Sequence, residues 1–318
     1  MSYSVVSYFC GCGGLDLGFC GGFNYGGESY KKLPFDIEAA FDNNEKAIET
    51  YNHYFAHKAD VADVTELTLD DLPKASVLIG GFPCQDFSSC GPLKGLTSAR
   101  GQLYKELIRY IDKHEPKVVV GENVINLLRI DGGKAVKTII EDLEHAGPGY
   151  RVQVWNMFAP DYGVPQNRQR LFFVGVRSDL EGDPIKPEAD FSNKPRSIKW
   201  AIGDLEGITD ESVPNQSQYF KASKAKKGNG QGDEVNKADE PAYTIRANPK
   251  SRVQFHYNLE RRLTVRECAR IQTFPDDFKF PHSMTTSMFE IGNAVPPVLA
   301  YRVASSIADY LDAIVGGD

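Results

Sequence analysis

The expected architecture follows from one stretch of sequence, Ala75-Ser76-Val77-Leu78-Ile79-Gly80-Gly81-Phe82-Pro83-Cys84-Gln85. Its apolar run, 75–79, is typical of a buried parallel strand, and Pro83 forces the chain out of that strand. Cys84 therefore stands at the carboxyl end of a strand, where open α/β sheets bind their ligands, and the two preceding glycines allow a substrate to approach closely. Cys84 is the candidate nucleophile. The alternative is that it is a small buried apolar residue, as most isolated free cysteines are.

The composition is that of a globular protein: the chain has 318 residues, of which 41% are hydrophobic and 25% are charged. One large domain and a smaller one are expected. The first residues carry no basic segment, and no apolar run approaches a membrane span, so we expect a cytosolic protein with no membrane contact. The six cysteines lack zinc-site spacing, which predicts reduced thiols and no metal. The net charge of −7 gives no sign of nucleic acid, so any phosphate contact requires a local basic face.

Hydrophobic patterning predicts strands that alternate with helices, which is typical of a parallel sheet. The expected strands are Val5–Phe9, Phe35–Phe41, Ala75–Ile79 and Lys117–Gly121, and a β-hairpin is expected over Arg151–Val176. The expected helices are Glu45–Tyr54, Gly101–His114, Arg262–Phe274 and Val298–Leu311.

A glycine-rich turn follows the first expected strand, within Cys10-Gly11-Cys12-Gly13-Gly14-Leu15. Such a turn brings backbone amides and a helix amino end close to a bound ligand, which favours a nucleotide. The spacing is not that of a dinucleotide-binding motif, and a plain tight turn explains it about as well. Asp42 ends the second strand and is a candidate for the two hydroxyls of a ribose, although Asn43 or Asn44 could cap the next helix there. Asp60-Val61 repeats the pattern.

A second chemical group follows the strand 117–121, in the run Glu122-Asn123-Val124. Because neighbouring parallel strands end at the same edge of a sheet, Cys84 and Glu122 are expected to lie together as nucleophile and acid. Arg168 and Arg170 are two residues apart, so in a strand they would share a face and hold a phosphate or carbonyl oxygen.

Residues from about 179 to 257 are rich in Gly, Pro, Asn and Lys and show little periodicity. Residues 215–258 contain eight basic and four acidic side chains, a local net charge of +4 in an acidic protein. A solvated lysine-rich loop is as plausible from this segment alone as a surface that binds phosphate.

Six blocks in order make the chain resemble the cytosine-5 DNA methyltransferases of bacterial restriction-modification systems. They are Phe9-Cys10-Gly11-Cys12-Gly13-Gly14, Pro83-Cys84-Gln85, Glu122-Asn123-Val124, Gln166-Asn167-Arg168-Gln169-Arg170, Arg266-Glu267-Cys268-Ala269-Arg270 and Gly292-Asn293-Ala294-Val295. The resemblance implies a Rossmann-like class I α/β catalytic domain (1–180), a smaller irregular target-recognition domain (181–280) and a C-terminal segment (281–318) that returns to the first.

The resemblance also implies roles for individual residues. The expected catalytic residues are Cys84, Glu122, Arg168 and Arg170. Contacts to S-adenosylmethionine are expected from Phe9, Gly11, Gly13, Gly14, Leu15, Asp42, Asn43, Asp60, Val61, Pro83, Leu103, Asn293 and Ala294. Contacts to DNA are expected from Gln85, Ser88, Arg100, Lys226, Lys227, Thr244, Arg246 and Arg252.

The implied reaction is methyl transfer to C5 of a cytosine flipped out of duplex DNA. The implied context is a monomer in the bacterial cytoplasm, at the nucleoid, that protects DNA from a separately encoded restriction endonuclease. A tRNA cytosine-5 methyltransferase has similar motifs, and the basic segment favours a duplex. A non-catalytic DNA-binding regulator needs no Cys84–Glu122 pair, and the glycine spacing disfavours a nicotinamide dehydrogenase.

Overall fold

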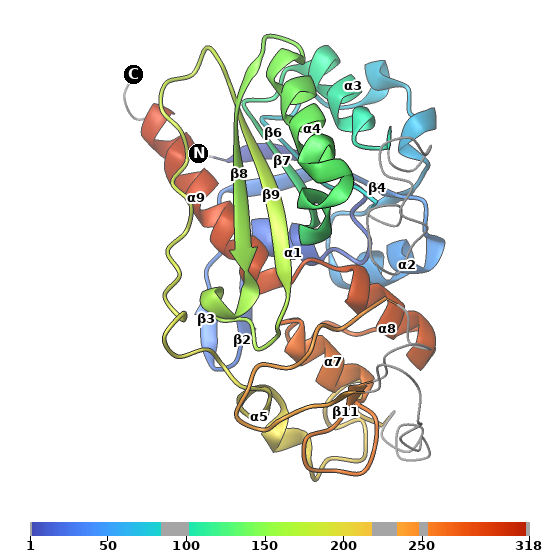
Figure 1. Ribbon diagram of the computed structural model, residues 1–318. Helices are drawn as coiled ribbons and strands as arrows, with labels where there is room; N and C mark the ends of the chain where they lie inside the picture. The colour runs from blue at the N-terminus through green and yellow to red at the C-terminus, as the bar shows by residue number, and fades with distance from the viewer. Residues whose placement is uncertain (1, 84–101, 218–233, 248–253, 316–318) are drawn as a thin grey trace.

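The computed structural model describes residues 2–83, 102–217, 234–247 and 254–315. Its central sheet has the strand order β5-β4-β1-β6-β7-β9-β8 (Figure 1). Strands β5, β4, β1, β6 and β7 run parallel, whereas β9 is antiparallel to both of its neighbours. The parallel part places the carboxyl ends of β1, β4, β6 and β7 at one edge, where such sheets bind ligands.

Strands and helices alternate through much of the chain. The first half comprises β1 (Tyr3–Tyr8), α1 (Gly14–Cys20), β2 (Phe23–Tyr25), β3 (Glu28–Tyr30), β4 (Phe35–Asp42), α2 (Glu45–Tyr54), β5 (Asp60–Val61), β6 (Val77–Gly81), α3 (Lys105–His114), β7 (Val118–Val124) and α4 (Lys134–His145). The second half comprises β8 (Tyr150–Phe158), β9 (Gln169–Arg177), α5 (Ile198–Ile202), β10 (Glu234–Val235), β11 (Gln254–Phe255), α7 (Val265–Ile271), α8 (Met284–Asn293) and α9 (Pro297–Val315).

Each face of the sheet is covered by its own hydrophobic core. On one face, α3 and α4 pack on β6, β7 and β9, with Leu107, Ile111 and Ile139 buried there. On the other face lie α1, α2 and α9 (Figure 1). Helices α1 and α9 approach closely, because a Cβ atom on Gly18 would lie 2.3 Å from the Cβ of Ala300. Burial on both faces explains the nearly continuous apolar runs of β6 and β7.

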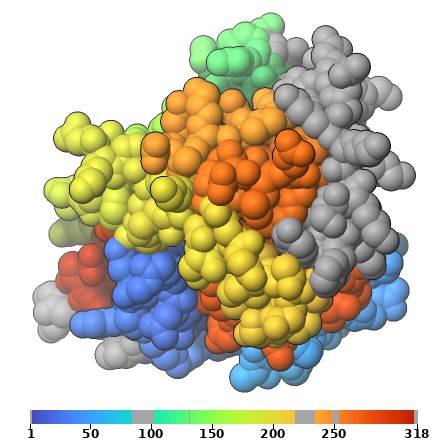
Figure 2. Space-filling view, turned by 90° about the horizontal axis from the view of Figure 1, so that it is seen from below, coloured from blue at the N-terminus to red at the C-terminus, as the bar shows by residue number. Residues whose placement is uncertain are grey.

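A lobe of short elements, formed by residues 196–217, 234–247 and 254–282, lies beyond the carboxyl ends of the parallel strands (Figure 1). Figure 2 looks onto it and shows its yellow and orange segments forming one continuous face beside the blue N-terminal residues. Helix α7 begins at a capping box made by Thr264 and Glu267. Glu267 is fully buried and receives hydrogen bonds from both terminal nitrogens of Arg261, at 2.8 and 2.6 Å. Removing either partner would leave the other charge buried and unpaired, so the pair holds Arg261 against the first turn of α7.

The β2–β3 hairpin joins this lobe to the sheet domain. The Tyr25 hydroxyl donates to the carbonyl oxygen of Arg270 at 2.7 Å, and its ring meets the edge of Trp200 on α5 at 5.8 Å between centroids. The Arg196 guanidinium lies over the Trp200 ring, 4.2 Å from its centroid. Trp200 is 41% exposed, whereas Trp155 in β8 is 2% exposed.

The structure confirms the α/β architecture and most of the expected elements, with shifted ends. Helix α2 has the expected bounds, and β1 ends at Tyr8 because Phe9 takes a positive φ of 56°. Helices α3 and α7 are shorter than expected; α7 cannot begin before the cap at Thr264. The sequence patterns did not predict α4, α8 or the β2–β3 hairpin.

None of the helices in the described ranges is long and apolar enough to span a membrane. Within the same ranges, no three His, Cys, Asp or Glu side chains are grouped to hold a metal ion. The cysteines described, Cys10, Cys12, Cys20 and Cys268, carry free thiols.

Candidate active site

Glu122 lies at the carboxyl end of β7, directly beside the end of β6. The register of the two strands pairs Gly81 with Glu122. A Cβ atom on Gly81 would lie 3.4 Å from Oε2 of Glu122, so the carboxyl group lies over the end of β6. Cys84 comes three residues after Gly81 and itself lies outside the described residues. The structure therefore places Glu122 beside the end of β6, and the expected proximity of Cys84 to Glu122 stays a prediction.

Arg170 holds Glu122 from the antiparallel strand β9. Its Nε lies 2.8 Å from Oε1 of Glu122, and both side chains are nearly buried. Burial raises the pKa of Glu122, and the nearby guanidinium groups of Arg170 and Arg168 only partly oppose that rise. A carboxyl group whose pKa is raised is a candidate for a general acid.

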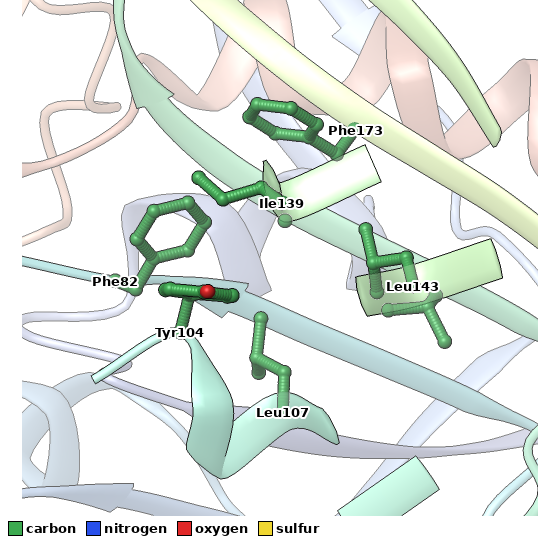
Figure 3. Close-up of a pocket in the computed structure, with 8 residues that line it drawn as sticks. Phe82, Tyr104, Leu107, Ile139, Leu143 and Phe173 are labelled. Atoms are coloured by element: carbon green, nitrogen blue, oxygen red, sulfur yellow. The ribbon is translucent and has the colours of Figure 1, made fainter. Parts of the chain in front are cut away.

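The chain that leads into Cys84 is anchored on two sides. The Asn123 side chain, 1% exposed, donates from Nδ2 to the carbonyl oxygen of Phe82 at 3.1 Å. The Phe82 ring packs among Tyr104, Leu107 and Phe173, as Figure 3 shows. The cavity left between these side chains is about 10 Å³, enough for at most one water molecule, so it serves packing and holds no ligand.

Arg168 has a different environment from Arg170. It is 2% exposed and precedes β9, which begins at Gln169, so the expected strand face shared by the two arginines does not form. Its Nη1 donates to the carbonyl oxygen of Ile245 at 3.0 Å, and its Nη2 donates to those of Gly292 and Ala294 at 2.9 and 3.0 Å. Since these bonds hold three main-chain carbonyls, the arrangement fits a residue that positions backbone segments.

The glycine-rich turn after β1 has backbone angles that side chains rarely adopt. Gly11 and Gly13 have φ angles of +54° and +91°. Among the residues that the structure describes, no atom lies within 4 Å of where a Cβ on Gly11 would be, so Gly11 faces open space with respect to them. A Cβ on Gly13, by contrast, would lie 2.4 Å from the Phe55 ring and 2.9 Å from the Tyr51 ring. The turn is thus packed on one side and open on the other.

Asp42 fixes this turn to the end of β4. Its Oδ2 accepts a hydrogen bond from the Gly11 amide at 2.9 Å, and its Oδ1 accepts one from the Asn44 amide at 2.8 Å. Asn44 caps α2 through its own side chain, so helix capping is served without Asp42. Each oxygen of Asp42 retains a lone pair, which leaves the carboxylate able to accept further hydrogen bonds from a ligand.

The other residues expected to contact the cofactor differ in how exposed they are to solvent. Asp60 and Val61 pair with the end of β4 and are exposed, Val61 by 54%. Asn293 at the end of α8 is exposed, whereas Leu15 is 5% exposed and can face a ligand only through its backbone. Phe9, Pro83, Leu103 and Ala294 are half-buried. Carboxylates beside apolar surface at a strand edge fit a nucleoside, whose sugar hydroxyls need acceptors and whose base needs an apolar contact.

Comparisons with known proteins agree with this geometry. The profile of the family described as C-5 cytosine-specific DNA methylase matches residues 3–309. The chain belongs to this family. It is 33% identical to the Type II methyltransferase M.FnuDI of Fusobacterium nucleatum, over 96% of this chain and 94% of that one. It is also 33% identical to the Type II methyltransferase M.NgoPII of Neisseria gonorrhoeae, over 97% and 96%.

Solved structures share the fold of this C-5 cytosine-specific DNA methylase. A prophage-encoded DNA modification methyltransferase from E. coli superposes with a TM-score of 0.74 at 21% identity, covering 98% of this chain and 100% of that one. The Dnmt2 methyltransferase of S. pombe superposes with a TM-score of 0.66 at 18% identity, covering 98% and 99%. The chain is a DNA (cytosine-5-)-methyltransferase with a Rossmann-like fold, and its family and fold imply that S-adenosylmethionine is its cofactor.

The residues expected at DNA fall largely outside the described part of this DNA methylase. The structure does not describe Gln85, Ser88, Arg100, Lys226, Lys227 and Arg252, nor Cys84. Thr244 and Arg246 are described, and both are half-buried. The Thr244 hydroxyl donates to the carbonyl oxygen of Asn167. This bond ties the 242–247 segment to the loop that also carries Arg168.

The sequence analysis assigned no role to four residues that contact the segments around the site, Asn123, Gln166, Gln272 and Gly292. The Gln166 Oε1 accepts from the Ile245 amide at 2.9 Å, and the Gln272 Nε2 donates to the Ala294 carbonyl at 2.6 Å. Asn123 and Gln166 stand within quoted motifs, so their place in the sequence was a signal. Gln272 gave none, because its partner lies 22 residues away on another element.

Proposed function

We propose that this enzyme methylates C5 of a cytosine, flipped out of duplex DNA at a specific sequence, through a covalent bond between Cys84 and C6 of the ring. The observation that carries the proposal is the buried Glu122 carboxyl group, held by Arg170 beside the end of β6, three residues before Cys84. A base that enters between the two strand ends would meet a thiol and an acid together.

Each group has a defined part in this chemistry. Cytosine C5 is a weak nucleophile, and addition of the Cys84 thiolate to C6 gives C5 enamine character. Glu122 donates a proton to N3 as electron density moves onto the ring, and Arg170 stabilises the exocyclic oxygen O2. Bound S-adenosylmethionine supplies the methyl group as an electrophile on a sulfonium. Transfer of the C5 proton to solvent and of the N3 proton back to Glu122, as the Cys84–C6 bond breaks, then restores the aromatic ring and the Cys84 thiolate.

The cofactor is assigned to the open side of the glycine turn. Gly11, Gly13, Gly14 and Leu15 would meet it through their backbone, and the carboxylates of Asp42 and Asp60 would accept from its polar groups. Apolar contact would come from Phe9, Val61, Pro83, Leu103 and Ala294, and Asn43 and Asn293 would add polar contacts. The exposed Val61 and the open space at Gly11 support this assignment.

Residues 181–280 would read the DNA, with residues 1–180 and 281–318 forming the catalytic part. We further propose that the enzyme acts as a monomer in the bacterial cytoplasm and protects DNA from a separately encoded restriction endonuclease. The Type II names of its relatives support that last role.

One experiment tests the proposal directly. Plasmid DNA is treated with the purified protein and S-adenosylmethionine, and modified cytosines are mapped by bisulfite sequencing. We expect 5-methylcytosine at one recurring sequence. In a parallel assay with methyl-labelled S-adenosylmethionine, transfer of the label to cytosine N4, to adenine N6 or only to an added tRNA would refute the proposal.

A further inference from the structure

Gly292, one residue before the end of α8, lies directly against the segment that carries Arg246. A Cβ atom on this glycine would lie 2.3 Å from the carbonyl carbon of Arg246 and 2.4 Å from the amide nitrogen of Ala247. Real Cβ atoms do not approach backbone so closely, so only glycine lets the Arg246–Ala247 peptide occupy this position.

Ile245, the residue before Arg246, is also held in place. Both main-chain polar groups of Ile245 are bonded by buried side chains: its carbonyl oxygen by Arg168 at 3.0 Å and its amide by Gln166 at 2.9 Å. Arg168 also binds the carbonyl oxygens of Gly292 and Ala294. A single guanidinium therefore ties Ile245, the residue before Arg246, to Gly292 and Ala294.

The cofactor turn lies on the far side of residues 292–295. A Cβ atom on Gly14 would lie 2.4 Å from the Val295 carbonyl oxygen and 3.0 Å from the Ala294 Cβ. Residues 292–295 therefore make two close contacts: Gly292 lies against the Arg246–Ala247 peptide, and Ala294 and Val295 lie against Gly14 in the cofactor turn.

We propose that Gly292 and Arg168 are positioning residues for sequence recognition: together they set the height and direction from which the Arg246 segment meets the DNA bases. This inference rests on the proposed function, in which Arg246 reads a base. An arginine that binds a guanine edge through two parallel hydrogen bonds tolerates little displacement of its backbone. Gly292, although it lies in a segment assigned to the cofactor, would then act on sequence choice.

The test compares Gly292→Ala and Arg168→Lys with Gly207→Ala as the matched control, since a Cβ atom on Gly207 would meet no atom of the described residues within 4 Å. For each protein, kcat/KM is measured on the cognate duplex found by bisulfite mapping and on duplexes with single-base changes. The affinity for S-adenosylmethionine is measured separately, without DNA. In Arg168→Lys the charge near Glu122 remains, but one ammonium replaces two nitrogens that hold separate carbonyls.

We expect Gly292→Ala and Arg168→Lys to reduce discrimination between cognate and altered duplexes about tenfold or more, the scale of one bidentate base contact. Gly207→Ala should leave both discrimination and S-adenosylmethionine binding at the wild-type values. Thermal unfolding identifies a variant that has lost its fold.

Equal losses of kcat/KM on cognate and altered duplexes in the folded variants would overturn the inference. If Gly292→Ala does not fold, Arg168→Lys decides alone, and wild-type discrimination in that variant is again a refutation. The proposed function has its own outcome: it fails if the wild-type protein methylates no cytosine in DNA.

Discussion

Glu122 has a buried carboxyl group with an arginine partner. Burial and the arginine act on its pKa in opposite directions, and the larger effect decides how well it can serve as an acid. Burial raises the pKa, and the facing Arg170 lowers it by a smaller amount. Replacing Glu122 with Gln keeps the shape of the side chain and removes its transferable proton. We expect Glu122→Gln to slow methyl transfer by about two to four orders of magnitude, the usual scale for a positioned acid, with duplex affinity nearly unchanged.

The measurement is single-turnover methyl transfer together with a binding isotherm for the same variant. Unchanged turnover would remove Glu122 from the chemistry. A joint loss of turnover and binding would instead indicate that the pair with Arg170 serves the shape of the site.

Cys84 is tested through the bond that it is proposed to form. With 5-fluorocytosine at the target position, fluorine cannot leave C5 as a proton does, so the adduct should persist. We expect a denaturation-resistant complex between wild-type protein and this DNA, visible by gel electrophoresis. The complex should be absent with Cys84→Ser, and equal trapping by both proteins would argue against a Cys84 adduct.

For single residues, prediction from the sequence succeeded at the strand ends and failed where distant segments meet. Glu122 beside the end of β6 could be predicted, because parallel strands finish at a common edge. The setting of Arg168 could not, since it depends on where residues 245 and 292–294 come together, 77 and 124 or more positions along the chain. No local pattern encodes such a meeting.

The junction of α2 and α8 contains a buried acid that the chemistry does not use. Glu290, 3% exposed, accepts from the Thr50 hydroxyl at 2.8 Å, and burial raises its pKa to about 7. His282 lies 3.9 Å from its other oxygen. Lys46 and Glu49 on α2 act on the same carboxyl group in opposite directions.

This junction predicts a pH-dependent stability. The folded pKa exceeds the unfolded one, so between about pH 4.5 and 7 the folded state keeps a proton that the unfolded state loses. The free energy of unfolding should therefore fall as pH rises through that window, by at most about 1.4 kcal/mol per pH unit from this group. Glu290→Gln should remove this contribution.

Urea unfolding of wild type and Glu290→Gln at a series of pH values measures the difference. Glu45→Gln, at an exposed position on α2, is the control and should keep the wild-type slope. The prediction is wrong if the Glu290→Gln curve runs parallel to that of the wild type.

Among the elements, strong local signals predicted well. Helix α2 has an amphipathic pattern and an Asn44 cap, and its bounds are those expected. The β2–β3 hairpin has strands of three residues each, too short for a periodic pattern. Its aromatic residues are placed by distant partners, such as Tyr301 against Phe23 and Tyr30. Tertiary packing, which the sequence does not display, decides such elements.

For the whole molecule, we propose that this acidic protein binds the DNA polyanion through its basic segment, residues 215–258. Removing Lys227 should weaken binding to all sequences alike and lower the salt slope by about one unit, since a lysine meets phosphate as a point charge. Removing Arg246 should cost about 1–3 kcal/mol at the cognate site and relax sequence choice.

Binding isotherms for Lys227→Ala and Arg246→Ala, on cognate and scrambled duplexes at several salt concentrations, separate the two effects. If Arg246→Ala weakens both duplexes equally, Arg246 contacts the DNA backbone and does not read a base.

The two tryptophans of the chain stand in separate parts of the molecule, one in each of two contrasting environments. Trp155 is enclosed in β8 and donates to Gln153 at 2.7 Å, whereas Trp200 is partly open to water beneath the Arg196 guanidinium. Their fluorescence should therefore differ in wavelength and in access to a soluble quencher. In Trp155→Phe, the remaining emission would come from α5 alone, and any change on adding duplex would report the lobe without a contribution from the sheet.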